Sequence, residues 1–186
     1  MNPHLNSRPT APMVALAIAG LVFASPARDD ATAATPPKDP CALLKPTDIQ
    51  ALALGAKIGS GVLTSNAPLG ASCEYRWGPR TSEWGETSFT VALVDASKVW
   101  PGGLSSAAIK QRVLVEVKIG GPDASEIPSI GDGAVFTTDP KSHNAKAKAY
   151  LVKAKGLVLE LGFHGGNPLG QKGTLIALLK AAAAAL

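Results

Sequence analysis

His143 and His164 are the side chains of the predicted folded domain that are best suited to acid–base chemistry. A serine hydrolase of the α/β type would carry a Gly-x-Ser-x-Gly elbow, and the sequence contains none. His164-Gly165-Gly166 resembles the oxyanion loop of lipases, but without the elbow serine it indicates a loop at a strand end. We therefore predict no catalytic residues. The alternative is a hydrolase whose dispersed active site lies near His164.

Metal and phosphate chemistry is equally poorly supported. The sequence has no His-x-x-x-His pair and no carboxylate cluster, although a pairing of either histidine with Asp132 or Glu160 stays open. Residues 165–174 lie between a predicted strand and a predicted helix, as a phosphate-binding loop would. Gln171, however, stands where that loop needs its lysine. We predict neither a metal nor a cofactor.

The tryptophans suggest a different kind of site, for sugar rings or another apolar ligand. Trp77 shares a predicted strand face with Cys73 and is expected in the core. Trp84 lies in a loop and Trp100 directly precedes a Pro-Gly-Gly break, so both can reach solvent. We name Trp84, Trp100 and His164 as ligand-binding candidates. The alternative is that the two loop tryptophans are lids over the core.

Lysines gather along one predicted hairpin, and they suggest a surface for a partner. Lys146, Lys148, Lys153 and Lys155 are our candidates for docking on an envelope protein or an anionic envelope polymer. The alternative is an edge strand that its charges protect from aggregation.

Composition limits the class of protein. The 186 residues allow one domain or two small ones. Apolar residues make up 46% and aromatic residues 5%, so the core must consist mainly of Leu, Val, Ile and Ala. The formal net charge is only +4, and the sequence lacks the strong basic patch that is typical of nucleic-acid-binding proteins. We therefore predict no nucleic-acid partner.

The N-terminus is typical of a secretory signal peptide. A polar stretch with Arg8 precedes an apolar run at 13–23 and a group of small residues, and cleavage after Ala24 or after Ala27 stays open. We place the signal peptide at 1–27. An apolar run this short spans roughly 17 Å, against about 30 Å of bilayer hydrocarbon, so no stable membrane span is expected after cleavage.

Residues 28–39 are rich in Ala, Thr and Pro and contain no large apolar side chain, which predicts a flexible linker. The folded domain is placed at 40–186. The expected product is soluble, either periplasmic or secreted.

Two cysteines lie in this domain, and in an exported protein an even number indicates a disulfide. A bond between Cys41 and Cys73 closes a loop of about 33 residues, worth roughly 3–4 kcal/mol in the chain-entropy model. A redox or metal pair would need closer spacing.

The elements that must position these residues follow from periodicity. Thr47 and Gln50 fit a capping box for a helix of about two turns that ends at Gly55. Strands are predicted at 57–64, 73–77 and 89–94. A helix begins after Ser105 or Ser106, although 113–117 would also suit a strand.

A hairpin of two alternating strands, 146–151 and 157–163, is followed by a helical stripe over 175–182. This order predicts an α+β fold: an antiparallel β-sheet with helices packed on one face, in a single domain with one disulfide.

Three stretches, 39–44, 70–75 and 127–134, resemble a family of exported bacterial domains of unknown function, many of which look like actinobacterial lipoproteins. The resemblance covers most of residues 39–186. It implies a disulfide between the first helix and a central strand, and it implies no catalytic residues. The sequence departs from the family because no cysteine stands at the cleavage point, so no lipid anchor is predicted.

Together these features predict a non-catalytic binding or interaction module of the cell envelope. Its partner would be a small ligand, an envelope protein or an anionic polymer.

Overall fold

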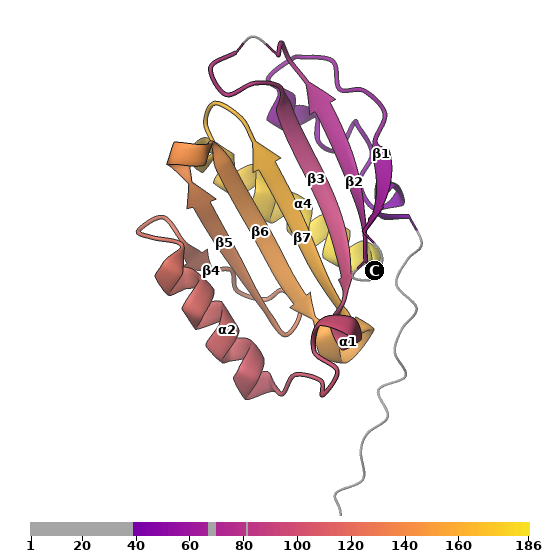
Figure 1. Cartoon of the computed structure of the whole chain (residues 1–186), viewed down its shortest axis with the longest axis vertical. Coiled ribbons are helices and arrows are strands. Elements are labelled where there is room, and N and C mark those ends of the chain that lie inside the picture. The colour runs from indigo at the N-terminus through magenta and orange to yellow at the C-terminus, as the bar shows by residue number, and fades with distance from the viewer. Residues whose placement is uncertain (1–38, 67–69, 81) are drawn as a thin grey trace, which may run out of the picture. The chain divides into compact units, whose positions relative to one another are not determined.

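The predicted antiparallel sheet is present. The computed structural model describes residues 39–66, 70–80 and 82–186, so the predicted signal peptide and nearly all of the linker lie outside the described residues. The strands are β1 Val62–Asn66, β2 Gly70–Trp77, β3 Thr87–Asp95, β4 Ser125–Glu126, β5 Gly133–Asp139, β6 Asn144–Leu151 and β7 Leu157–His164. In this part of the chain they form one sheet with the order β1-β2-β3-β7-β6-β5-β4 (Figure 1).

Two helices of 14 residues pack on this sheet, α2 Ser106–Ile119 and α4 Lys172–Ala185. The Ser105 hydroxyl accepts a hydrogen bond from the Ala108 amide at 3.2 Å, so Ser105 is the N-cap, and α2 continues as a helix through 113–117. Short elements complete the described chain: η1 Pro40–Ala42, η2 Gln50–Ala53, α1 Ala96–Val99, η3 Pro140–Ser142, α3 Val152–Lys155 and η4 Leu169–Gln171.

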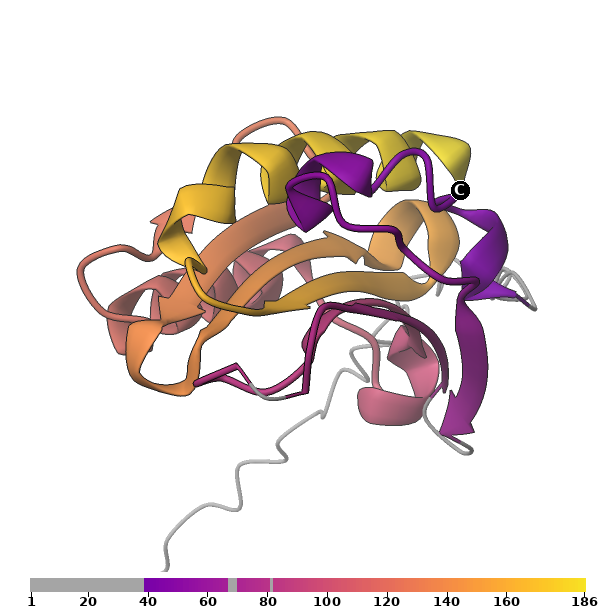
Figure 2. The ribbon, with the colours of Figure 1, turned by 90° about the horizontal axis from the view of Figure 1, so that it is seen from above.

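The larger part of the core lies between the sheet and α4. Alternate residues of the hairpin strands point to this side, as predicted, and Leu159 and Leu161 of β7 are fully buried there. Helix α4 covers them with Leu175 and Leu179. Figure 2 shows α4 and the N-terminal turns on the same side of the sheet.

Helix α2 packs on the opposite face. Ile109 and Val113 bury themselves against Val135, Tyr150 and Val158, which alternate with the residues facing α4. The α+β class, the antiparallel sheet and the disulfide are confirmed. The helices, however, cover parts of both faces rather than one, because β5, β6 and β7 carry apolar residues on both sides.

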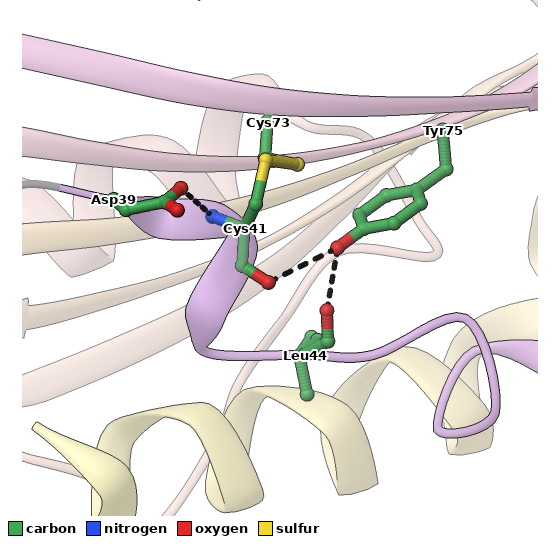
Figure 3. Close-up of a disulfide and its surroundings, with 5 residues drawn as sticks. All are labelled: Asp39, Cys41, Leu44, Cys73 and Tyr75. Atoms are coloured by element: carbon green, nitrogen blue, oxygen red, sulfur yellow. Dashed lines mark hydrogen bonds between the residues drawn. A yellow bond between two sulfur atoms is a disulfide. The ribbon is translucent and has the colours of Figure 1, made fainter. Parts of the chain in front are cut away.

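The predicted disulfide between Cys41 and Cys73 is present, with their Cα atoms 5.1 Å apart (Figure 3). It joins η1 to β2. The Tyr75 hydroxyl, two residues further along β2, donates to the Leu44 carbonyl oxygen at 2.5 Å. Asp39 caps η1 by accepting from the Cys41 amide at 2.8 Å. A covalent bond and a buried hydrogen bond therefore fix the N-terminal segment to the sheet.

The first helix is shorter than predicted. The capping box between Thr47 and Gln50 does not form, and only η2 is helical. The Gln50 side chain instead donates to the Ala56 carbonyl oxygen at 2.8 Å, closing the turn behind it. The first strand is displaced in the same region, since β1 begins at Val62 rather than at 57.

A glycine is required where β1 approaches the disulfide. A Cβ added to Gly61 would lie 2.8 Å from the Tyr75 ring and closer still to the Cys73 sulfur. Gly61→Ala should therefore lower the free energy of unfolding by about 1–3 kcal/mol, measured by urea denaturation. Gly59→Ala is the matched control, because its Cβ would meet nothing within 4 Å. Equal stability of the two variants would contradict this packing.

Two buried tyrosines predict alkaline sensitivity. Burial raises the pKa of Tyr150, and the hydrogen bond that its hydroxyl donates to Glu116 raises it further. Burial also raises the pKa of Tyr75. Since the unfolded chain loses these protons first, near the ordinary tyrosine pKa of about 10, their stabilisation is complete below that pH and is lost above it.

Urea midpoints between pH 8 and 11.5 should therefore fall as the pH passes 10, and less steeply in Tyr150→Phe than in the wild-type protein. Parallel curves for the two proteins would refute the contribution of Tyr150.

Candidate functional site

A pocket of about 440 Å³ opens at the end of the sheet where β2 and β7 finish and β3 begins. Its volume lies within the range of small-molecule sites, roughly 300–1,000 Å³. We call it the aromatic pocket. It is lined by Leu52, Ala53, Leu54, Ala56, Trp77, Gly78, Trp84, Thr87, Phe163, Gly166, Asn167 and Gln171.

Trp84 enters this lining because its loop is tied to the end of β7. The Nε2 atom of His164 lies 2.7 Å from the Trp84 carbonyl oxygen, which can only accept, so the imidazole donates there. The Trp84 ring packs on the backbone of Gly166, where an added Cβ would lie 2.7 Å from the indole. It also contacts His143, with ring centroids 5.9 Å apart.

The inner wall of the aromatic pocket comes from the sheet. Trp77 of β2 and Phe163 of β7 pack with ring centroids 6.5 Å apart, and both are buried. η2 and the residue after it, Leu54, also line the pocket, and Leu54 is 86% exposed. Leu54 has a φ of +49°, a conformation that is uncommon for a leucine and that places an apolar side chain at the rim.

The chemistry of the lining is distinctive because no ionisable side chain takes part in it. Its most buried polar residue is Gln171, which is 9% exposed and which, apart from the two tyrosines, is the only buried residue of polar type in the described part of the chain. Few polar groups among apolar and aromatic walls are typical of sites for small neutral ligands.

The structure places the three predicted ligand-binding residues in different surroundings. Trp84 lines the aromatic pocket. His164 lies behind Trp84 and positions its loop, without lining the pocket. Trp100 belongs to the cluster on the α2 face, where it packs against Tyr150 and under the guanidinium of Arg112, 4.7 Å from the ring centroid. Trp100 therefore packs on the core cluster of the α2 face and does not line the aromatic pocket.

The surroundings of His164 do not resemble a hydrolytic site. Its Nδ1 atom lies 3.3 Å from the Asn144 side-chain oxygen, and its Nε2 atom is engaged by the Trp84 backbone. Across residues 39–66, 70–80 and 82–186, no serine, threonine or carboxylate is hydrogen-bonded to this imidazole. The described geometry thus lacks the base–nucleophile pair that hydrolysis by this histidine would use.

The candidate lysines do not form one strip. Lys146 and Lys148 lie on β6 and both pair with Glu160, at 3.1 and 3.5 Å, and Lys148 also pairs with Glu116 at 3.1 Å. Lys153 and Lys155 lie beyond the strand, on α3. These ion pairs neutralise much of the charge that would attract an anionic polymer.

A larger groove of about 870 Å³ runs between the end of α2 and the β5–β6 hairpin, and we call it the α2 groove. Its lining includes Lys146 and Lys148 together with carboxylates from Glu116, Asp123 and Asp139. Lys148 and Glu116 pair with each other across this groove, so its lining is charged where that of the aromatic pocket is not.

The residues that the structure describes also bear on metal binding and on membrane insertion. No group of three or more His, Cys, Asp or Glu side chains in them could hold a metal ion. None of their helices has the length and apolar character needed to cross a membrane.

Comparison with known proteins adds no relative: no family model, no curated protein and no solved structure matches this chain.

Several pocket residues were missed by the sequence analysis. Gln171 was noted only as the residue that breaks a phosphate-loop pattern, and Leu54 was expected at the end of a helix. Gln171 stands directly before a helix, where Ser, Thr, Asp or Asn is the usual cap. This unusual residue type was the signal that could have drawn attention to it. Nothing in the local sequence of Leu54 indicated its position at a pocket rim.

Proposed function

We propose that this chain is an exported, non-catalytic binding module and that the aromatic pocket is its ligand site. The observation that carries this proposal is the pocket itself: tryptophan and phenylalanine walls, no ionisable group, and one buried carboxamide. Binding a flat apolar molecule against such a lining is favourable, because both apolar surfaces leave water. The lining offers no ionisable side chain for acid–base catalysis.

The export half of the proposal rests on the N-terminal sequence and on the disulfide. A bond between Cys41 and Cys73 persists in oxidising compartments and is rare in the cytosol of mesophiles. Protein recovered from the periplasm or medium should begin at Ser25 or Arg28 and contain no free thiol. A chain that begins at Met1, or that carries two free thiols, would contradict export.

The binding half can be tested with a neutral apolar probe. N-phenyl-1-naphthylamine, which fluoresces more strongly in apolar surroundings, should bind the purified domain saturably at one site per chain. A linear, non-saturating response would contradict the proposed site.

The alternative of a hydrolase near His164 makes a different prediction. Saturable turnover of a 4-nitrophenyl ester that is abolished by His164→Asn would refute a non-catalytic function. We expect no such turnover, because both ring nitrogens of His164 face the Trp84 and Asn144 oxygens.

A further inference from the structure

Gln171 occupies an unusual position for its residue type. It is the N-cap of α4, yet its side chain makes no capping hydrogen bond. Only 9% of the residue is exposed, and it forms part of the aromatic pocket. The side chain has thus been withdrawn from the solvent without being used to begin the helix.

The carboxamide of Gln171 is also without a protein partner in the described part of the chain. Every fully enclosed side-chain nitrogen or oxygen in that part has a hydrogen-bond partner. The Gln171 amide must therefore keep some contact with open space, and Gln171 is one of the residues that line the aromatic pocket. A polar group held in this way is available to a ligand at little further desolvation cost.

The lining restricts the chemistry of that ligand. A charged ligand would lose its hydration with no opposite charge to replace it, since no ionisable side chain lines the pocket. A sugar would need many polar partners, and the Asn167 side-chain oxygen already accepts from the Gly170 amide at 3.0 Å. Flat rings suit the walls formed by Trp77, Trp84 and Phe163.

We infer that the ligand is a neutral planar molecule carrying a cis amide, such as a lactam or a carboxamide, whose N–H and C=O groups pair with the Gln171 carboxamide. Glutamine presents an NH2 donor and a carbonyl acceptor side by side, which matches a cis amide with two hydrogen bonds. This inference rests on the proposed function and names the ligand class of the same site.

Two ligands of nearly identical shape test the inference. 2-Quinolinone carries a cis amide, and coumarin replaces its N–H with an oxygen that can only accept. Titrated into the isotopically labelled protein and followed by NMR, 2-quinolinone should bind about tenfold more tightly than coumarin, since about 1.4 kcal/mol corresponds to tenfold. Gln171→Met, which keeps the length and apolar stem of the side chain, should reduce that preference to less than twofold, and far-ultraviolet circular dichroism checks that the variant is folded.

The outcomes separate the two proposals. Equal affinity of the wild-type protein for 2-quinolinone and coumarin, with saturable binding of the apolar probe, would overturn the role of Gln171 alone. Retention of the tenfold preference in Gln171→Met would overturn it as well. Failure of all three molecules to bind would overturn the pocket as a ligand site. If the variant does not fold, the comparison of the two ligands on the wild-type protein decides the question.

Discussion

Replacing Cys41 and Cys73 together by alanine should lower the free energy of unfolding by about 2–5 kcal/mol, the usual loss when a small exported domain loses its disulfide. The bond joins η1 to β2 across 32 residues of sequence, and Cys73 is fully buried. Without it, the segment that leads to η2 is held mainly by the Tyr75 hydroxyl and by apolar contacts of the core.

The reduced wild-type protein is the control for this prediction, because it breaks the bond but keeps both side chains. The reduced protein and the doubly substituted protein should unfold at similar urea concentrations. Both midpoints should lie well below that of the oxidised protein. A reduced protein that unfolds at the same urea concentration as the oxidised one would show that the disulfide does not stabilise the fold.

Trp84→Ala should weaken the binding of N-phenyl-1-naphthylamine at least tenfold. The indole forms one wall of the aromatic pocket, and removing a large aromatic surface from a contact costs about 1.5–3 kcal/mol. Trp84 is half-buried in a loop, so the fold should survive the change. Far-ultraviolet circular dichroism and the urea midpoint check that it does.

Trp100→Ala provides the matched control, since it removes the same side chain from the other face of the sheet. Its affinity for the probe should stay within twofold of the wild-type value, although its stability falls. A loss of affinity in Trp100→Ala as large as that in Trp84→Ala would locate the probe elsewhere than in the aromatic pocket.

Much of the sheet could be predicted because its strands carry a simple alternation. Cys73, Tyr75 and Trp77 point into one side of the sheet, and so do Leu159 and Leu161 of the hairpin. In these strands the burial pattern repeats every second residue, which is the signal that periodicity detects. The disulfide could be predicted for a similar reason, since only one pairing of two cysteines exists.

Other elements escaped prediction because tertiary contacts determine them. β5 is buried on both sides, so Val135 faces α2 while Phe136 faces α4, and no alternation marks the strand. The capping-box pattern at Thr47 was wrong because the Gln50 side chain closes the turn with Ala56 instead.

The site could be predicted only in part. Trp84 was identified from its type and its loop, but its contact with His164 joins residues 80 positions apart in the sequence. That contact holds His164 against the backbone of Trp84, outside the lining of the aromatic pocket. The function of Gln171 depends on burial, which its sequence neighbours do not determine.

The most direct test of the aromatic pocket is an NMR measurement of where a neutral ring binds. With coumarin at saturation, intermolecular NOEs should connect its ring protons to the indole protons of Trp77 and Trp84, and the Gln171 side-chain amide signals should shift. NOEs to Trp100, or shifts confined to Lys146 and the rest of the α2 groove, would contradict the assignment of the ligand site.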